Sequence, residues 1–450
     1  MSKIFMALSF AVLLFLPAGV AYAGAGAPTA EVREVVTLLE GLRKVTSENY
    51  SVRIARQDEA IAGEDALIAR SGLLPRINAS GSRTALSDQP IMRTYSGDSP
   101  PAEVPTADRN YFSYNINIQQ LLFDFNGTLS KYRASKSLLE AQKLDTQRVR
   151  NSLALEFAIA YFDVLEAKKL VGAAEKEVER LESHLKDAEG MYSAGVITKN
   201  DLLQARVRLS DAKQRRLTAV NSQDVLTSRL SNLLLIPLDR KLDVVEYAEE
   251  VVNPAVFNYE QIWKKAMEKR PEIRIADRTI EAVDFEAVAK KSEFLPKVYA
   301  KVGNDYMENS YAVHPDNWSF MVGVDINLFE GGSSRADLRK TAYRKQKLVE
   351  QRSKLVDEVK LEVKRYFLDL QNAYERIQVT YDVLDQAQEN LRINRGRYEA
   401  GVGTATDVLD AVTLLTVAET NHIRSLYDYV KSEAAVAYAS GEDLVQVYSR

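Results

Sequence analysis

The chain has no cysteine among its 450 residues. This absence excludes disulfide bonds, thiolate nucleophiles, cysteine-based metal sites and a lipid-bearing cysteine near the amino terminus. Proline is absent from residues 106–236 and again from residues 316–450. Because proline ends or kinks a helix when it lies in the interior, both stretches can hold long uninterrupted helices.

Long hydrophobic runs are absent after residue 23, so no transmembrane helix is expected. Before that point, Lys3, an apolar run at residues 4–16 and the triplet ending at Ala23 form the pattern of a cleaved signal peptide rather than a buried amino-terminal helix. Export is therefore expected, with a mature chain that begins near Gly24. If this chain meets a membrane, it must do so with strands.

The charge balance also excludes one class of partner. The formal net charge is −4, and Lys and Arg are dispersed among Asp and Glu. A nucleic-acid interface needs a basic stripe, and none is present, so no nucleic-acid partner is expected.

The most informative positive feature is an internal duplication. Residues 191–205 read MYSAGVITKNDLLQA and residues 397–411 read RYEAGVGTATDVLDA, with eight of fifteen positions identical at an offset of 206. Upstream, SGLLPR and SEFLPK match at an offset of 221. The extra residues lie between Thr84 and Tyr111, in a segment rich in Pro, Ser and Asp that is typical of an exposed loop. The two copies are predicted to be two versions of one structural unit.

Within each copy, apolar and small residues recur with alternating spacings of three and four, which is the pattern of a coiled-coil seam. The first copy has the series Val164, Ala167, Val171, Ala174, Val178, Leu181, Leu185, Ala188 and Tyr192. The second copy has the series Leu370, Ala373, Ile377, Thr380, Leu384, Ala387, Leu391, Asn394 and Tyr398. Beyond the turns, the pattern resumes at Leu202, Ala205, Leu209 and Ala212, and at Val408, Ala411, Leu415 and Ala418.

An Ala-Gly-Val turn separates the two arms of each series. Gly195 and Gly401 are predicted to take the left-handed conformation that ends a helix. Each copy is thus expected to form a long antiparallel helical hairpin, whose first arm spans on the order of 100 Å at 1.5 Å per residue.

Ahead of each hairpin the hydrophobic period changes from 3.5 to 2. Strands are predicted at residues 111–123 and 318–329, and weaker alternation predicts strands at residues 76–84 and 297–306. A soluble sandwich remains open, but Phe112 and Trp318 near one strand end favour a lipid interface. Strands of about 9–11 residues cross a bilayer when tilted. Four strands cannot close a barrel, so several chains would have to contribute.

No enzyme signature is present. The sequence has no phosphate-binding glycine loop, nucleophile elbow or zinc-protease motif, and its three histidines lie in unrelated contexts. We therefore expect no catalytic residues, no cofactor and no metal site. At the turns, Thr198 with Asp201 and Thr404 with Asp407 match a helix-capping pattern. Asp410 lies one turn beyond Asp407, and such a pair repeated around a pore would make a ring of negative charge.

Three kinds of motif carry a family resemblance. They are the SxxLP sequences that begin at Ser71 and Ser292, the LFD and LFE sequences that begin at Leu122 and Leu328 and precede glycine, and the two YxAGxxTxxDxLxA turns. On these residues the chain resembles the TolC family of outer-membrane efflux ducts, over essentially the whole mature sequence.

The resemblance implies a mainly α-helical fold with a β-barrel portion. It implies a homotrimer in which a twelve-stranded outer-membrane β-barrel continues into a periplasmic α-barrel of twelve helices. Residues 24–236 and 271–450 would be the two structural repeats, with helical hairpins at residues 127–236 and 332–440. Residues 237–270 would form an equatorial connector between the repeats, with a short helix at residues 259–268.

The resemblance also implies partners and a location. The chain would lie in the outer membrane of a Gram-negative bacterium, in contact with lipid. There it would receive substrates from a periplasmic adaptor protein and an inner-membrane transporter of the RND or ABC type.

The resemblance further assigns roles at the hairpin tips. Asp407 and Asp410 match the electronegative ring at the channel entrance, and Tyr398 matches a tyrosine that links neighbouring helical pairs in the closed state, with Asp201 as its partner. The arginine that the family's best-known member has at the tip corresponds to Gly403, which implies a closure held differently. Adaptor docking would involve Ala194, Gly195, Val196, Thr198, Ala400, Gly401, Val402, Gly403 and Thr404.

The competing hypothesis is an exported structural coiled coil or adhesin without a channel. It explains the helices and the signal peptide, but not the period-2 segments at matching places in both copies. The sequence does not identify the transported substrate, because a passive duct takes its specificity from the pump.

Overall fold

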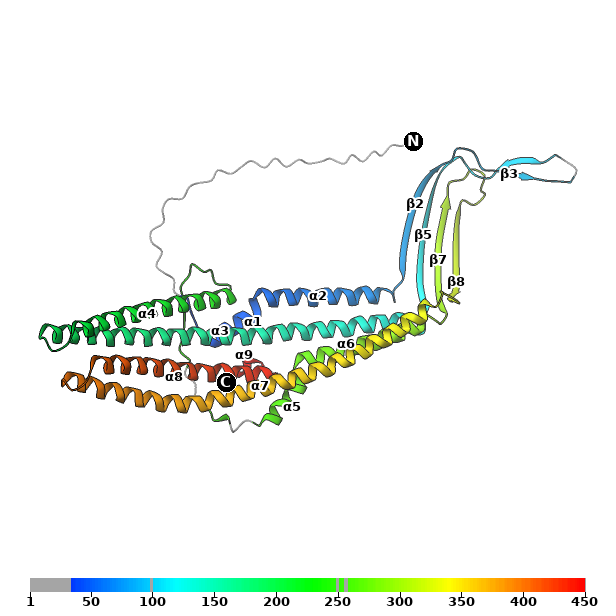
Figure 1. Ribbon diagram of the computed structural model, residues 1–450. Coiled ribbons are helices and arrows are strands. Elements are labelled where there is room, and N and C mark those ends of the chain that lie inside the picture. The colour runs from blue at the N-terminus through cyan, green and yellow to red at the C-terminus, as the bar shows by residue number, and fades with distance from the viewer. Residues whose placement is uncertain (1–33, 98–99, 248–250, 255–257, 450) are drawn as a thin grey trace, which may run out of the picture.

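The computed structural model describes residues 34–97, 100–247, 251–254 and 258–449. The predicted signal peptide at residues 1–23 lies outside the described residues. The described chain is elongated, with long helices running along it, a four-stranded sheet at one end and the turns of the two helical hairpins at the other (Figure 1). None of the helices in the described ranges combines the length and the apolar character needed to cross a bilayer.

The two copies have the same order of elements. The first copy contains α2 (Tyr50–Ser71), β2 (Arg76–Ala85), β5 (Asn110–Phe123), α3 (Gly127–Ser193) and α4 (Lys199–Leu233). The second contains α6 (Pro271–Ser292), β7 (Lys297–Met307), β8 (Asp316–Asp325), α7 (Ser333–Glu399) and α8 (Ala405–Ala439). The first arms α3 and α7 have 67 residues each, and the second arms α4 and α8 have 35 each.

The four main strands form one antiparallel sheet in the order β2-β5-β7-β8. The central pair, β5 with β7, joins the two copies, so the two edges of the sheet come from different copies. Strand β8 ends at Asp325, whereas the alternation predicts a strand as far as residue 329. Asp325 pairs with Lys297, the first residue of β7, so the next residues have no neighbouring strand in the described part of the chain.

One face of the sheet is apolar and largely uncovered. The exposed side chains of this face include Ile77, Phe112, Ile116, Ile118, Trp318, Phe320, Val322 and Val324. The opposite face is polar and is joined across strands by hydrogen bonds between Asn78 and Asn117, between Ser82 and Ser113, and between Asn115 and Asp305. Soluble single chains rarely leave so large an apolar face open to water.

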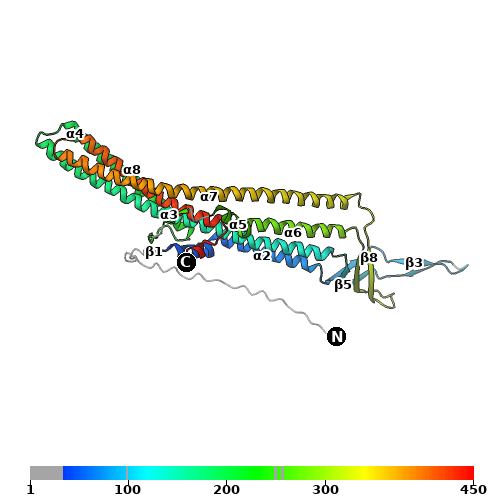
Figure 2. The ribbon, with the colours of Figure 1, turned by 90° about the horizontal axis from the view of Figure 1, so that it is seen from below.

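The long loop of the first copy contains a strand pair that the sequence did not predict. Strands β3 (Ile91–Thr94) and β4 (Ala102–Pro105) form an antiparallel ribbon that projects beyond the main sheet (Figures 1 and 2). The base of the ribbon is fixed to the shorter loop of the second copy, because Asn309 donates to the Thr106 carbonyl at 3.0 Å.

The predicted hairpin seams are confirmed in both copies. The seam residues of α4 and α8 are all buried, namely Leu202, Ala205, Leu209, Ala212, Val408, Ala411, Leu415 and Ala418. Gly195 and Gly401 have φ angles of +73° and +70°, so both take the predicted left-handed conformation. The exception is Tyr192, which is 41% exposed, whereas its counterpart Tyr398 is 4% exposed.

Short elements halfway along the length of the molecule pack beside the long helices, and together we call them the belt (Figure 1). Strand β1 (Glu34–Val36) pairs in parallel with β6 (Leu242–Val244), and Tyr161 donates its hydroxyl to the Val245 carbonyl at 2.7 Å. Burial raises the pKa of Tyr161 to about 12, so the hydroxyl keeps the proton that this bond needs. Helices α1 (Leu38–Glu48), α5 (Tyr259–Lys269) and α9 (Leu444–Val447) complete the belt.

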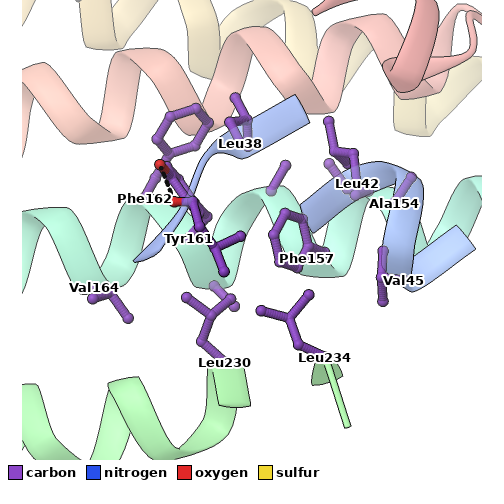
Figure 3. Close-up of a cluster of buried hydrophobic side chains, with 14 of the residues drawn as sticks. Leu38, Leu42, Val45, Ala154, Phe157, Tyr161, Phe162, Val164, Leu230 and Leu234 are labelled. Atoms are coloured by element: carbon purple, nitrogen blue, oxygen red, sulfur yellow. Dashed lines mark hydrogen bonds between the residues drawn. The ribbon is translucent and has the colours of Figure 1, made fainter. Parts of the chain in front are cut away.

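The largest apolar core lies where α1 crosses α3 (Figure 3). Phe157, Tyr161 and Phe162 of α3 are at most 1% exposed. Helix α1 approaches closely because Gly41 has no side chain: a Cβ built there would lie 2.1 Å from the Phe157 ring. The contact fixes the amino-terminal part of the chain against the first hairpin.

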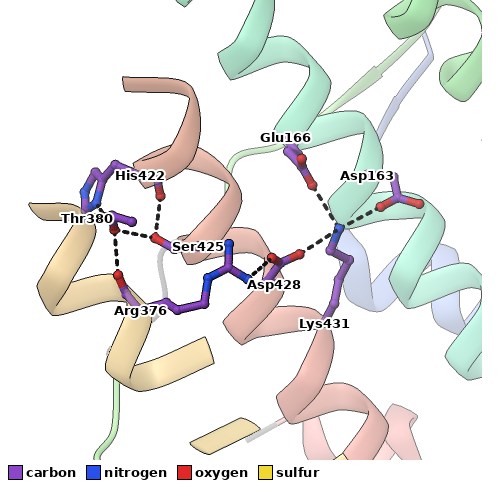
Figure 4. A network of polar contacts seen from close by, with 8 residues as sticks. All are labelled: Asp163, Glu166, Arg376, Thr380, His422, Ser425, Asp428 and Lys431. Atoms are coloured by element: carbon purple, nitrogen blue, oxygen red, sulfur yellow. Dashed lines mark hydrogen bonds and ion pairs between the residues drawn. The ribbon is translucent and has the colours of Figure 1, made fainter. Parts of the chain in front are cut away.

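Charged side chains tie the two hairpins together at the same level (Figure 4). Lys431 of α8 lies 3.0 Å from the Asp163 carboxylate and 2.9 Å from that of Glu166, both on α3. Within the second hairpin, Arg376 of α7 pairs with Asp428 of α8 at 3.1 Å. Lys431 is 20% exposed, so water screens this contact less than it screens a surface pair.

We expect Gly41→Ala to destabilise the belt. A methyl group at this position overlaps the Phe157 ring, and forcing extra volume into a packed core costs about 1–3 kcal/mol. Thermal unfolding of the detergent-solubilised protein would detect the loss as a lower midpoint. Gly63→Ala is the matched control, because a Cβ at Gly63 of α2 meets nothing within 4 Å. Equal midpoints for the two variants would contradict the overlap.

Candidate functional site at the helical tips

The predicted docking residues lie together at the end of the molecule opposite the sheet (Figure 1). Eight of the nine are exposed, namely Ala194, Gly195, Val196, Thr198, Ala400, Gly401, Val402 and Thr404, and Gly403 is half-buried. The backbone N–H groups of Val402 and Gly403 both donate to the Arg397 carbonyl, at 2.9 and 3.0 Å. The turns are therefore small and exposed. Helix α7 ends where the Arg397 carbonyl accepts these two hydrogen bonds.

Each turn starts its second helix with the same reciprocal cap. In the first copy, the Thr198 N–H donates to the Asp201 carboxylate at 3.0 Å, and the Asp201 N–H donates to the Thr198 hydroxyl at 3.3 Å. In the second copy the corresponding distances between Thr404 and Asp407 are both 3.1 Å. Hydrogen bonds from Thr404, through its side chain and then its backbone, hold the pKa of Asp407 below its usual range.

Asp407 and Asp410 both face solvent on α8. The side chains between and beside them, Val408, Leu409 and Ala411, are buried, and Leu409 packs against the first hairpin. The structure therefore presents two carboxylates one helical turn apart on the water-facing side of the tip. The equivalent surface of the first copy has only one carboxylate, Asp201, because Gln204 stands where the second copy has Asp410.

Tyr398 lies where the two hairpins meet, but it makes no hydrogen bond with Asp201 in this conformation. Its side chain packs between the hairpins, with its ring centroid 5.2 Å from that of His184 on α3. In this conformation the Tyr398 hydroxyl has no hydrogen-bond partner, and Asp201 is engaged by its cap. Burial, followed by the charges of Asp201 and Asp187, raises the pKa of Tyr398. A direct link between Tyr398 and Asp201 is therefore not formed here and stays a prediction.

His184 is a site residue that the sequence reasoning missed. It is 4% exposed, and its Nε2 atom is buried without a hydrogen-bond partner. Burial lowers the pKa of His184 below its ordinary value of 6.5, with the Asp187 carboxylate opposing the shift and the Arg395 guanidinium adding to it. The only sequence signal was its position immediately before Leu185 of the seam, which indicates partial burial but not a partner.

The described residues contain no group of three or more histidine, aspartate or glutamate side chains placed to hold a metal ion. The tips thus present caps, two solvent-facing carboxylates and a buried histidine–tyrosine contact.

Comparison with known proteins identifies relatives along nearly the whole chain. A family model described as outer membrane efflux protein matches residues 42–234 and 262–442. The alkaline protease secretion protein AprF of Pseudomonas aeruginosa is 24% identical over 417 residues, covering 90% of this chain and 84% of AprF. The outer membrane protein TolC of Escherichia coli is 22% identical over 423 residues, covering 90% of this chain and 82% of TolC.

Solved structures share the fold. The Campylobacter jejuni CmeC outer membrane channel superposes with a TM-score of 0.75 at 16% sequence identity, covering 90% of this chain and 85% of that one. At this identity the likeness establishes the architecture of the chain and not the roles of the tip residues.

We expect acid to loosen the contact around His184. When the hairpins separate, the exposed imidazole binds a proton near its ordinary pKa, whereas the buried imidazole binds one only at lower pH. Acid therefore favours the separated state, with the loss beginning as pH falls through about 6.5 and levelling off below the lowered pKa. Hydrogen exchange of α3 peptides near His184, corrected for intrinsic rates, should rise between about pH 7.5 and about pH 5.5.

The control for this experiment is His184→Gln, which keeps a polar side chain without the titration. Its corrected exchange should not change with pH over the same range. An equal response in the wild type and the variant would show that another group is responsible.

Proposed function

The chain belongs to the outer membrane efflux protein family, and we propose that it forms the outer-membrane exit duct of a tripartite efflux or secretion system. The observation that carries this proposal is the pairing, in each copy, of membrane-length strands with a helical hairpin about 100 Å long at 1.5 Å per residue. Strands alone would make a pore and helices alone a stalk. Joined end to end, they make a conduit that crosses the membrane and reaches far from it.

The sheet supports assembly from several chains. Its edges, β2 and β8, leave one row of backbone N–H and C=O groups each without a partner strand among the described residues. Unpaired backbone groups are costly in lipid, so strand β8 of one chain would pair with β2 of the next. Three chains give twelve strands, enough to enclose a lumen.

Exposed apolar stripes on the helices support the same assembly. Ile54, Ile61 and Ile68 recur every seven residues along α2 and are 62, 59 and 68% exposed. Leu361 and Leu368 of α7 show the same spacing and are also exposed. Seven-residue spacing is typical of a helix-packing seam, and no helix among the described residues covers these side chains. Packing against helices of neighbouring chains would cover them.

The carboxylates at the tips would set the electrostatics of the narrow end. Three chains bring six carboxylates, from Asp407 and Asp410, to the end away from the membrane. A ring of this kind attracts cations and repels anions. The open turns from Ala194 to Thr198 and from Ala400 to Thr404 would receive a periplasmic adaptor, which connects the duct to an RND or ABC transporter.

The alternative function, an exported coiled coil or adhesin without a channel, has less support. It accounts for the hairpins but not for the uncovered apolar face of the sheet, which carries Trp318 and Phe320 at 73% exposure each. Such side chains are expected at a lipid interface.

We expect the mature protein to be trimeric and to conduct ions. Native mass spectrometry in detergent should give three chains per particle, because twelve strands close the sheet without unpaired edges. Planar bilayer recordings on the same preparation should show discrete channel currents. A monomeric particle that stays soluble without detergent would contradict the proposal that the chain forms a duct.

We expect the Asp407→Asn and Asp410→Asn double variant to lose cation selectivity. Removing six carboxylates from the narrow end should lower the cation-to-anion permeability ratio by roughly two- to tenfold, with Asp410→Asn alone giving part of the change. Reversal potentials in asymmetric salt measure the ratio. Asp201→Asn is the matched control, since it removes one charge from the equivalent cap in the first copy. An unchanged permeability ratio in an intact double variant would show that Asp407 and Asp410 do not form a selective ring.

A further inference from the structure

The two hairpins have separate apolar cores towards their tips. Ala188, Leu202 and Ala205 pack inside the first hairpin, whereas Ala387, Leu415 and Ala418 pack inside the second. Two apolar clusters cross between them: Leu181 and Leu209 of the first hairpin meet Leu409 and Val412 of the second, and Met191 packs against Tyr398 and Val408 nearer the tips. Between the belt and the tips, each hairpin thus packs mainly around its own core, and a limited set of side chains holds the two hairpins together.

One ion pair in this set is both bidentate and largely buried. Arg180 of α3 donates to Glu419 of α8 through Nη1 at 2.9 Å and through Nη2 at 2.5 Å. The two side chains are 23 and 13% exposed. A two-point Arg–carboxylate contact fixes orientation as well as distance, and partial burial makes either partner costly to leave unpaired.

The other polar contacts between the hairpins are placed or exposed differently. Towards the tips, Arg395 donates to the Ser183 hydroxyl at 3.2 Å and lies 3.8 Å from the Asp187 carboxylate, and both of these contacts are exposed. Towards the belt, Lys431 binds Asp163, which lies roughly 25 Å from Arg180 along α3 at 1.5 Å per residue. Gly403 offers no side chain that could cross between hairpins. Arg180 with Glu419 is therefore the buried ionic contact that lies between the belt and the tips.

We propose that Arg180 and Glu419 form a positioning lock that keeps the second hairpin, with Asp407 and Asp410 at its tip, closed against the first. The inference rests on the proposed function, because it concerns the width of the narrow end of the duct. When the pair separates, the contacts of Lys431 keep the two hairpins together at the belt, and the part of α8 between the belt and the tip is released. The carboxylates at the tips then move apart and the entrance widens.

The test is single-channel recording on four forms of the full chain: wild type, Arg180→Glu, Glu419→Arg and the double exchange. Each single reversal places like charges opposite each other across the hairpins, so we expect the open fraction or the conductance to rise on the order of tenfold. The double exchange restores an opposite pair and should return the current to within about twofold of the wild type. Glu419→Gln, a neutral replacement of the same shape, should lie between these extremes.

Glu177→Gln is the matched control. Glu177 also makes a two-point contact with an arginine, Arg215, at 2.8 and 3.2 Å, but both residues belong to the first hairpin. This variant should lower the thermal midpoint of the protein without raising the current. A larger current for Glu177→Gln as well would show that general loosening, and not the cross-hairpin lock, controls the entrance.

The outcomes separate the two proposals. Single reversals that leave a conducting channel unchanged overturn the lock and leave the duct in place. Single reversals that raise the current without rescue by the double exchange also overturn it, because the side chains then act through packing alone. A wild-type protein without any current overturns the duct, and the lock with it.

Discussion

The pairing of β5 with β7 is the contact on which the arrangement of the whole chain depends. It runs from Ser113 opposite Met307 to Phe123 opposite Val298, and it is the only pairing in the main sheet between strands of different copies. Because β5 leads into α3 and β7 follows α6, this register sets two rigid helical systems side by side. Both hairpin turns consequently reach the same end of the molecule, where their side chains can act together.

Duplication gives the chain near-symmetry, and two departures from it lie towards the hairpin tips. Tyr192 and Tyr398 occupy equivalent positions, yet the first is exposed and the second lies against His184. Gln204 and Asp410 differ in the same way, since the second copy has a charge that the first lacks. The copies share a backbone plan but face different surroundings, so equivalent positions have come to serve different contacts.

Local periodicity predicted most of the fold. Spacings of three and four identified the buried seams, and the turn glycines were assigned their left-handed conformation from sequence alone. The pairing of β1 with β6 was missed, because three-residue strands whose paired residues are 208 positions apart carry no local signal. The ribbon of β3 and β4 was missed because its segment has the composition of a loop.

The candidate site was predictable only in part. The capping residues Thr198, Asp201, Thr404 and Asp407 follow from a four-residue pattern, since a cap depends on its own turn. The partners of His184 and Arg180 depend on how one hairpin lies on the other. That arrangement is a property of the assembled sheet and belt, and no spacing within a single helix encodes it.

The length of α3 gives small rotations a large effect at the far end. The part of α3 from Asp163, at the belt, to Ser193, at the turn, spans roughly 45 Å at 1.5 Å per residue. A helix of this kind acts as a stiff lever, so a tilt of about 5° at the belt carries the turn through roughly 4 Å. The aperture is thus governed by an angle set far from it, and a substitution in the belt can alter what passes at the tip without touching a residue there.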